Sequence, residues 1–255
     1  MVTVRIISSI KPSVEYGSGR LRNLVFWVSL LAAVILFVFP VCPAAAQDGR
    51  WVEVNGIPTF RDMGGYPAGD GIVKSGVLFR SGDLSKISEE GVEGLKRLGV
   101  VTVVDLRVGG GESSRIEELS GGSIEVRRLP MRADPLRDRN DYYKRMIVNS
   151  RESLIGLLGL LADKESLPLV IFDEDGVNEV DVAAQLILLT LGVSSPDVVS
   201  DYLLSNKHHA LLKREWGEII VRYFDEYGGM DYYTTKILGI PSDHIGRIRE
   251  NLITK

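Results

Sequence analysis

Uniformly apolar runs alternate with amphipathic segments through the middle of the chain. Consecutive apolar positions are typical of strands buried on both faces, whereas apolar residues at helical spacing between a capping residue and a glycine indicate helices. The pattern predicts strands at residues 76–82, 100–107, 123–130 and 167–172, and helices at residues 88–99, 109–122, 138–163 and 181–191. Because helices separate the strands, we predict an α/β fold with a mainly parallel central sheet flanked by helices.

The two ends of this region have simpler patterns. Gly64, Gly65 and Gly71 are turn formers within residues 61–71, and they predict a hairpin there. The chain beyond residue 191 is typical of a helical C-terminal part, whose last helix we expect Ser242 to cap. Since residues 47–255 contain no internal repeat and no long linker, they are predicted to form one domain.

The N-terminal segment has the layout of an export signal. Arg5, Lys11, Arg20 and Arg22 precede an apolar run at residues 24–39, which is followed by small residues and a predicted cut before Gln47. We therefore expect residues 1–46 to be a signal peptide and the domain to be exported, to a periplasm or out of the cell. The alternative is a membrane anchor through residues 24–43.

The composition excludes several kinds of partner and site. The chain of 255 residues is 45% hydrophobic and carries a net charge of -4, so nothing in it predicts a nucleic-acid partner. Its single cysteine, Cys42, lies in the N-terminal segment. The predicted domain therefore has no disulfide, no cysteine-bound zinc and no thiolate nucleophile.

Six segments together resemble the bacterial tyrosine/serine protein phosphatase family, which is part of the cysteine-phosphatase superfamily. They occur in the family's order at residues 56–66, 76–88, 99–107, 182–194, 201–206 and 238–252. The resemblance implies a protein-tyrosine-phosphatase-like fold over nearly all of residues 47–255. It also implies that the loop after the strand at 167–172 is the catalytic loop.

In the resembled family this loop has the form H-C-x-x-G-K-D-R-T-G and is followed by V-A-A. The match at residues 182–184 fixes the register, in which Gly176 is retained. The other family positions are replaced: Phe172 stands for the His, Asp173 for the nucleophilic Cys, Val177 for the Lys, Asn178 for the Asp, Glu179 for the phosphate-binding Arg, Val180 for the Thr and Asp181 for the final Gly.

These replacements remove the groups that the family's reaction needs, a thiolate of depressed pKa and an arginine that clasps the phosphoryl oxygens. Glu179 would face the phosphate where an attractive charge is required. Two unit charges ~4 Å apart interact by roughly 4 kcal/mol at an effective dielectric of ~20, so repulsion replaces a substantial attraction. We predict a catalytically inactive pseudophosphatase with a binding or scaffold role and no cofactor.

Three interpretations of the acidic residues stay open. They are a solvated surface loop with no ligand, a basic or phosphate-free peptide partner, or a calcium or magnesium site formed by Asp173, Asp175, Glu179 and Asp181. The sequence "VIFDEDGV" also resembles the first motif of haloacid-dehalogenase-type phosphatases. That resemblance implies the alternative function, a magnesium-dependent phosphate-ester hydrolase with Asp173 as nucleophile and Asp175 as general acid or base.

Further candidate ligand contacts lie at the ends of neighbouring strands. Arg80, Asp105 and Arg107 are expected to surround the loop, because the carboxyl ends of parallel strands meet at one edge of a sheet. The alternative for these residues is structural, an ion pair or hydrogen bonds that hold the loops.

Overall fold

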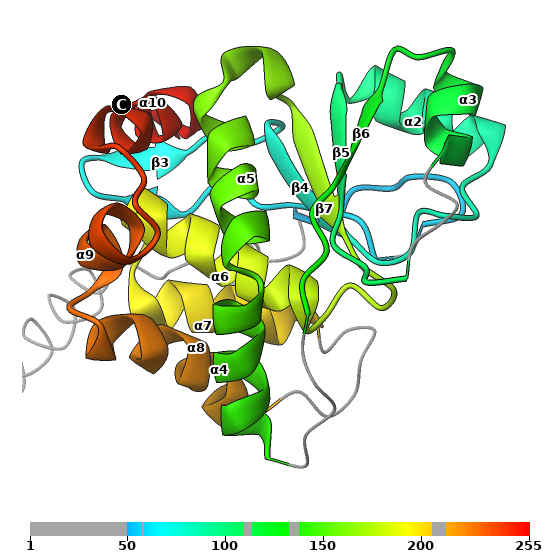
Figure 1. Ribbon diagram of the computed structural model, residues 1–255. Helices are drawn as coiled ribbons and strands as arrows, with labels where there is room; N and C mark the ends of the chain where they lie inside the picture. The colour runs from blue at the N-terminus through cyan, green and yellow to red at the C-terminus, as the bar shows by residue number, and fades with distance from the viewer. Residues whose placement is uncertain (1–49, 58, 110–113, 133–137, 206–212) are drawn as a thin grey trace, which may run out of the picture. The chain divides into compact units, whose positions relative to one another are not determined.

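A five-stranded sheet forms the centre of the described chain (Figure 1). The computed structural model describes residues 50–57, 59–109, 114–132, 138–205 and 213–255. In spatial order the strands are β1 (Arg61–Asp62), β4 (Leu78–Ser81), β7 (Leu169–Phe172), β5 (Thr102–Asp105) and β6 (Glu125–Arg128). The last four are parallel to one another and β1 is antiparallel. The predicted mainly parallel sheet is therefore confirmed.

The central strand β7 is buried on both faces. Leu169 and Ile171 belong to the larger hydrophobic core, whereas Val170 and Phe172 belong to the smaller core on the opposite face. This double burial explains why the strand is continuously apolar. Phe172 pairs in register with Ser81 of β4 and Asp105 of β5, so the three chains leave the sheet at the same edge.

Helices cover both faces of the sheet. Those that contribute to the smaller core are α2 (Glu89–Arg97) and α3 (Ser114–Ser120). Those that contribute to the larger core are α4 (Arg139–Asn149), α5 (Arg151–Ala162), α6 (Glu179–Leu191), α7 (Ser195–Leu204), α8 (Arg214–Glu226) and α10 (Ser242–Leu252). Short helical turns are present at η3 (Lys164–Ser166), α9 (Met230–Tyr232) and η5 (Tyr233–Ile237).

A second, three-stranded antiparallel sheet joins the predicted hairpin to the end of the chain. It consists of β2 (Pro67–Ala68), β3 (Gly71–Val73) and β8 (Ile253–Thr254). The two chains approach closely at Gly71, where a Cβ atom would lie 2.5 Å from the Thr254 carbonyl oxygen. A glycine is therefore needed at this position for the strands to pair.

Two predicted helix starts are corrected. Ser242 is the first residue of α10 and not its cap; Pro241 precedes the helix, and its carbonyl accepts from the His244 N–H at 3.0 Å. Helix α6 begins at Glu179, two residues before the predicted start. The loop between β7 and α6 is therefore residues 173–178, which we call the acidic loop.

The predictions for the N-terminal segment, residues 1–46 with Cys42, lie outside the described residues. Within the part of the chain that the structure describes, no helix is both long enough and apolar enough to span a bilayer.

Candidate functional site

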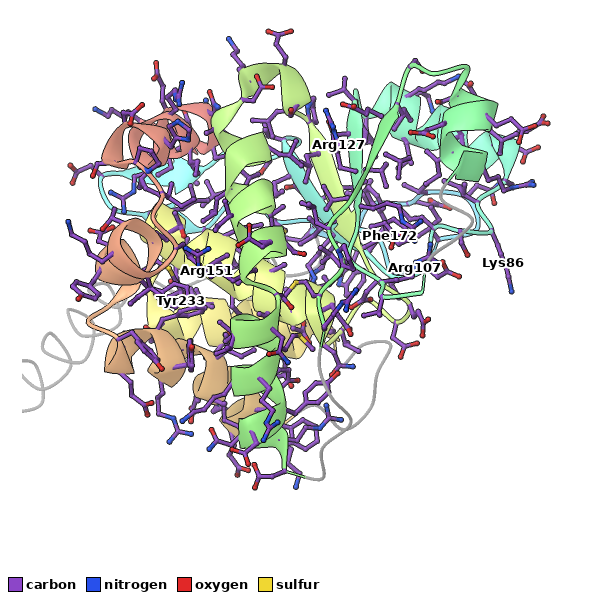
Figure 2. The ribbon with its side chains drawn as sticks, in the orientation of Figure 1. Lys86, Arg107, Arg127, Arg151, Phe172 and Tyr233 are labelled. Carbon is purple, nitrogen blue, oxygen red and sulfur yellow. The ribbon has the colours of Figure 1, made fainter. Side chains whose placement is uncertain are left out.

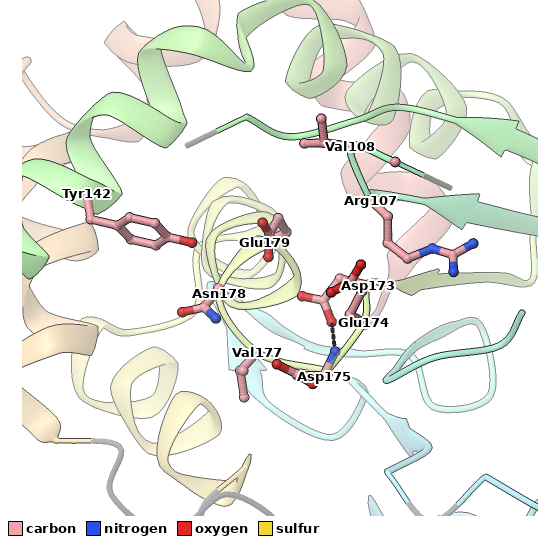
Figure 3. A pocket seen from close by; sticks show the side chains of 10 residues that line it. Arg107, Val108, Tyr142, Asp173, Glu174, Asp175, Val177, Asn178 and Glu179 are labelled. Atoms are coloured by element: carbon pink, nitrogen blue, oxygen red, sulfur yellow. Dashed lines mark hydrogen bonds between the residues drawn. The ribbon is translucent and has the colours of Figure 1, made fainter. Parts of the chain in front are cut away.

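A cavity of about 320 Å³ opens at the carboxyl edge of the main sheet, where β7 passes into α6 (Figure 3). The chain after β5 supplies one wall and Tyr142 of α4 supplies another. The residues that line it are Arg107, Val108, Gly109, Tyr142, Asp173, Glu174, Asp175, Val177, Asn178 and Glu179. The expected catalytic loop thus does border a cavity, and four of its lining side chains are carboxylates.

Asp173 lies at the base of this cavity with 2% of its surface exposed. Its Oδ1 accepts from the backbone N–H groups of Asp175, at 3.1 Å, and Gly176, and its Oδ2 accepts from the Val180 N–H at 3.0 Å. Burial raises the pKa of Asp173 well above its usual value, and the nearby Glu179 adds to this, although the hydrogen bonds from Val180 and Gly176 oppose the shift.

Two other residues that line the cavity, Glu179 and Tyr142, also have raised pKa values. Burial is the main reason that the pKa of Glu179 is raised, and the neighbouring Glu174 and Asp175 charges act in the same direction. Burial, followed by the Glu179 charge, raises the pKa of Tyr142 to about 12. Tyr142 therefore remains a neutral phenol at physiological pH, and the cavity disfavours any additional negative charge.

Asn178 closes the acidic loop in a conformation that is uncommon for residues other than glycine, with φ 58°. Its N–H donates to Asp181 Oδ2 at 3.1 Å, and its side-chain oxygen accepts from Arg139 Nη1 at 3.0 Å. Arg139 in turn lies 4.8 Å from the centroid of the Trp216 ring. Contacts from α4 and α6 therefore hold a strained residue at the rim of the cavity.

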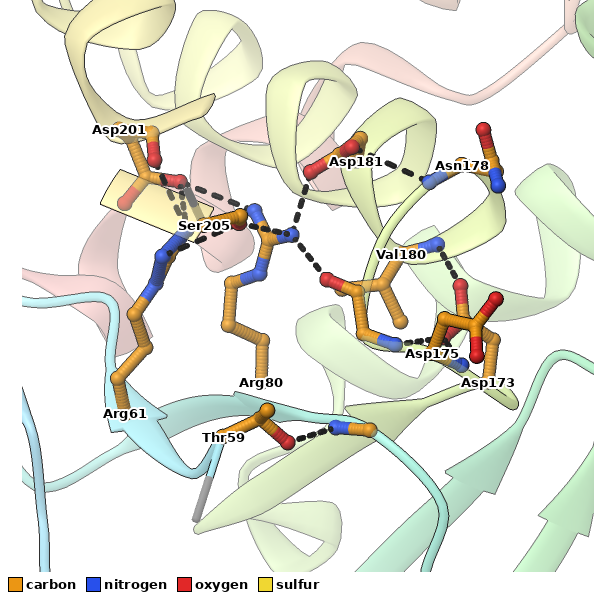
Figure 4. A network of polar contacts seen from close by, with 12 residues as sticks. Thr59, Arg61, Arg80, Asp173, Asp175, Asn178, Val180, Asp181, Asp201 and Ser205 are labelled. Carbon is orange, nitrogen blue, oxygen red and sulfur yellow. Dashed lines mark hydrogen bonds and ion pairs between the residues drawn. The ribbon is translucent and has the colours of Figure 1, made fainter. Parts of the chain in front are cut away.

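A buried network of charged side chains contacts the acidic loop from inside the protein (Figure 4). Arg80 Nη2 donates to the Gly176 carbonyl at 2.9 Å and to Asp181, while its Nη1 donates to Asp201 Oδ2 at 3.1 Å. Arg61 Nη2 also donates to Asp201 Oδ2, at 3.0 Å. All four charged side chains are at most 2% exposed. Two arginines and two aspartates thus balance one another inside the protein.

This network shifts the pKa values of its members. Burial lowers the pKa of Arg61 to about 10, and the adjacent Arg80 charge contributes to this. Burial tends to raise the pKa of Asp201, but Arg61 and Arg80 outweigh it, so the net shift is downward. Tyr66 also donates its hydroxyl to Asp201, at 2.9 Å. Asp201 is therefore the anionic centre of the network.

The three candidate ligand contacts at the strand ends have different surroundings. Arg80 lies under the acidic loop and does not line the cavity, so the structural alternative describes it. The Asp105 carboxylate accepts two hydrogen bonds from the Arg107 guanidinium, at 2.9 and 2.8 Å, and a third from the Arg107 N–H at 3.0 Å. Arg107 lines the cavity, with its guanidinium 4.9 Å from the Phe172 ring centroid (Figure 2). Ligand contact stays a prediction, and Arg107 is the best placed of the three.

The proposed cation site at Asp173, Asp175, Glu179 and Asp181 is not supported by the geometry. The carboxylate of Asp173 is directed at loop N–H groups, whereas that of Asp181 is paired with Arg80 beneath the loop. Among the described residues no group of three or more His, Cys, Asp or Glu side chains is placed to hold a metal ion. The four carboxylates are adjacent in sequence, but their oxygens do not converge on one point.

The buried position of Asp173 also counts against the hydrolase in which it is the nucleophile. A nucleophilic carboxylate must present an oxygen to the phosphorus atom. Here both oxygens accept hydrogen bonds from the backbone and the side chain is almost fully buried. The geometry therefore does not favour the magnesium-dependent alternative.

A family profile and a related protein identify the family to which the chain belongs. The profile of a family described as the tyrosine phosphatase family matches residues 52–254. A Cupriavidus necator protein that bears the name of a tyrosine-protein phosphatase is 31% identical over 194 residues, which cover 68% of this chain and 70% of that protein.

Two solved structures are also similar to this chain. The core catalytic domain of the PP-IP phosphatase SIW14 from S. cerevisiae aligns with a TM-score of 0.45 and 14% identity, over 64% of this chain and 90% of that domain. TpbA from P. aeruginosa aligns with a TM-score of 0.34 and 16% identity, over 71% of this chain and 91% of that protein.

Proposed function

Because the chain belongs to the tyrosine phosphatase family, we propose that it is a member that does not hydrolyse phosphate esters and that its acidic cavity has a binding or scaffold role. One observation carries this proposal. The cavity beside the family's catalytic loop is lined by the carboxylates of Asp173, Glu174, Asp175 and Glu179. The described chain has no cysteine, and the acidic loop has no basic residue.

Electrostatics supports the loss of phosphate binding. A phosphate dianion entering the cavity would meet Glu179, whose charged form is already disfavoured by burial and by Glu174. The guanidinium of Arg107, which lines the cavity, donates two hydrogen bonds to Asp105 and one to Asp83 at 3.2 Å. Its charge is therefore largely compensated before any ligand arrives.

The carboxylates that line the cavity favour a cationic partner. We propose a protein or peptide that inserts a lysine or arginine side chain between the acidic loop and Tyr142. The half-buried, neutral phenol ring offers a flat contact, and the carboxylates offer acceptors for the N–H groups of a guanidinium. The volume of about 320 Å³ is at the lower end of the range for ligand pockets, which suits one side chain better than a large ligand.

The compartment remains part of the proposal. The N-terminal pattern supports export, with attachment to a membrane through residues 24–43 as the alternative. In either case the partner would be met outside the cytoplasm.

The proposed inactivity is tested with p-nitrophenyl phosphate and the purified chain. We expect no turnover above the uncatalysed rate, with or without magnesium, because position 173 offers no exposed nucleophile. Asp173→Asn should leave this baseline unchanged. A cysteine-dependent phosphatase assayed in parallel is the positive control. Turnover by the unaltered chain that Asp173→Asn abolishes would refute the proposal.

The proposed partner chemistry is tested with a tetra-arginine peptide and its uncharged tetra-citrulline counterpart. We expect the arginine peptide alone to bind, with an affinity that falls as salt is added. Glu179→Gln should weaken binding by about fivefold, the effect of one partly exposed charge pair. Glu118→Gln makes the same charge change at an exposed position of α3, outside the cavity, and is the matched control. Equal effects of both substitutions would show that binding is not at the cavity.

A further inference from the structure

Three backbone N–H groups of one short segment point at a single carboxylate. The acceptor is Asp173, and the donors belong to Asp175, Gly176 and Val180 (Figure 4). The first two contacts span two and three residues and form a local turn. The third spans seven residues and ties the end of β7 to the first turn of α6. This last contact makes the arrangement more than an ordinary aspartate turn.

Backbone N–H groups that converge at the start of a helix form the usual geometry for binding an anion. Here the group that occupies these donors is a carboxyl side chain of the same segment, and it is almost fully withdrawn from solvent. A fourth N–H group, that of Asn178, donates to Asp181, so a second internal carboxyl group occupies this donor. An external anion would have to displace these carboxyl groups to reach the four N–H groups.

We propose that the Asp173 carboxyl group is a tethered acceptor, which occupies the N–H groups of the acidic loop and keeps the loop folded in the absence of any ligand. The loop is fixed from the opposite side by Arg80, which binds the Gly176 carbonyl and Asp181. The loop thus has internal partners on both sides, and its conformation does not depend on phosphate. This inference concerns the loop itself and holds whatever the cavity binds.

The inference predicts that removing the tethered carboxyl group creates an anion site. In a Glu179→Gln background, which removes the nearest repulsive charge, Asp173→Ala should expose the three N–H groups. Asp175→Ala in the same background is the matched control, because it removes a carboxyl group from the same cavity without freeing those donors. We expect the Asp173→Ala protein to bind inorganic phosphate about tenfold more tightly than the control, since it gains charge-assisted hydrogen bonds.

Calorimetry with inorganic phosphate at constant ionic strength measures both affinities. Equal affinities, or binding by neither protein, would overturn the inference. If circular dichroism shows that Asp173→Ala does not fold, amide hydrogen exchange of the unaltered chain decides. Slow exchange at Gly176 and Val180 in phosphate-free buffer, unchanged by added phosphate, supports the tethered carboxyl group. Fast exchange that phosphate slows contradicts it.

Discussion

Asp201→Ala is expected to lower the free energy of unfolding by about 3–5 kcal/mol, among the largest effects of a single substitution in this protein. Asp201 accepts hydrogen bonds from Arg61, Arg80 and Tyr66 at the centre of the buried network. Its removal would leave two buried guanidinium groups with one carboxylate, Asp181, between them. Asp201 opposes the lowering of the Arg61 pKa by burial, so without it the buried guanidinium either stays charged and uncompensated or loses its proton, and both outcomes cost stability.

Chemical denaturation monitored by circular dichroism measures the effect. Glu93→Ala is the control, because it breaks an exposed ion pair with Lys96 and should change stability by less than about 1 kcal/mol. Since the network also holds the Gly176 carbonyl through Arg80, Asp201→Ala should speed amide exchange in the acidic loop before global unfolding. A loss of stability no larger than that of Glu93→Ala would show that the network does not stabilise the fold.

The elements around the site could be predicted from the sequence because their signals are local. The continuous apolar run of β7 marks a strand buried on both faces, and the polar residues after Phe172 mark its end. A parallel sheet then places the following loop at the carboxyl edge beside those of β4 and β5. The position of the cavity follows from these facts alone.

The buried network could not be predicted, because its partners are distant in sequence. Arg61 and Asp201 are 140 positions apart, and an arginine in a two-residue edge strand resembles any surface residue in the sequence. The burial of Asp173 was missed for a related reason. Its contact with the Val180 N–H depends on how far the acidic loop folds back, and residue types alone do not specify this. Strand β8 has two residues and carries no periodic signal.

Reintroducing the two missing groups is expected to restore phosphate chemistry. The double substitution Asp173→Cys with Glu179→Arg would place a thiol at the carboxyl end of β7 and a guanidinium in the first turn of α6, where the side chain at 179 lines the cavity. The freed N–H groups and the helix N-terminus would lower the pKa of the thiol, and the arginine would attract the phosphoryl group. We expect hydrolysis of p-nitrophenyl phosphate at least about a hundredfold faster than by the unaltered chain, given the size of such electrostatic effects.

The first step would be attack of the thiolate on phosphorus, with cleavage of the ester bond and release of p-nitrophenolate. A rapid burst of nitrophenolate, close to one per protein molecule, would identify it. Asp173→Ser with Glu179→Arg is the matched control, which should bind phosphate to a similar extent without the burst, because a serine hydroxyl is not ionised there. If the folded double variant binds phosphate no better than the unaltered chain, then the backbone around the acidic loop has diverged as well. If it binds and reacts, the family's framework is intact and the side chains at positions 173 and 179 alone account for the inactivity.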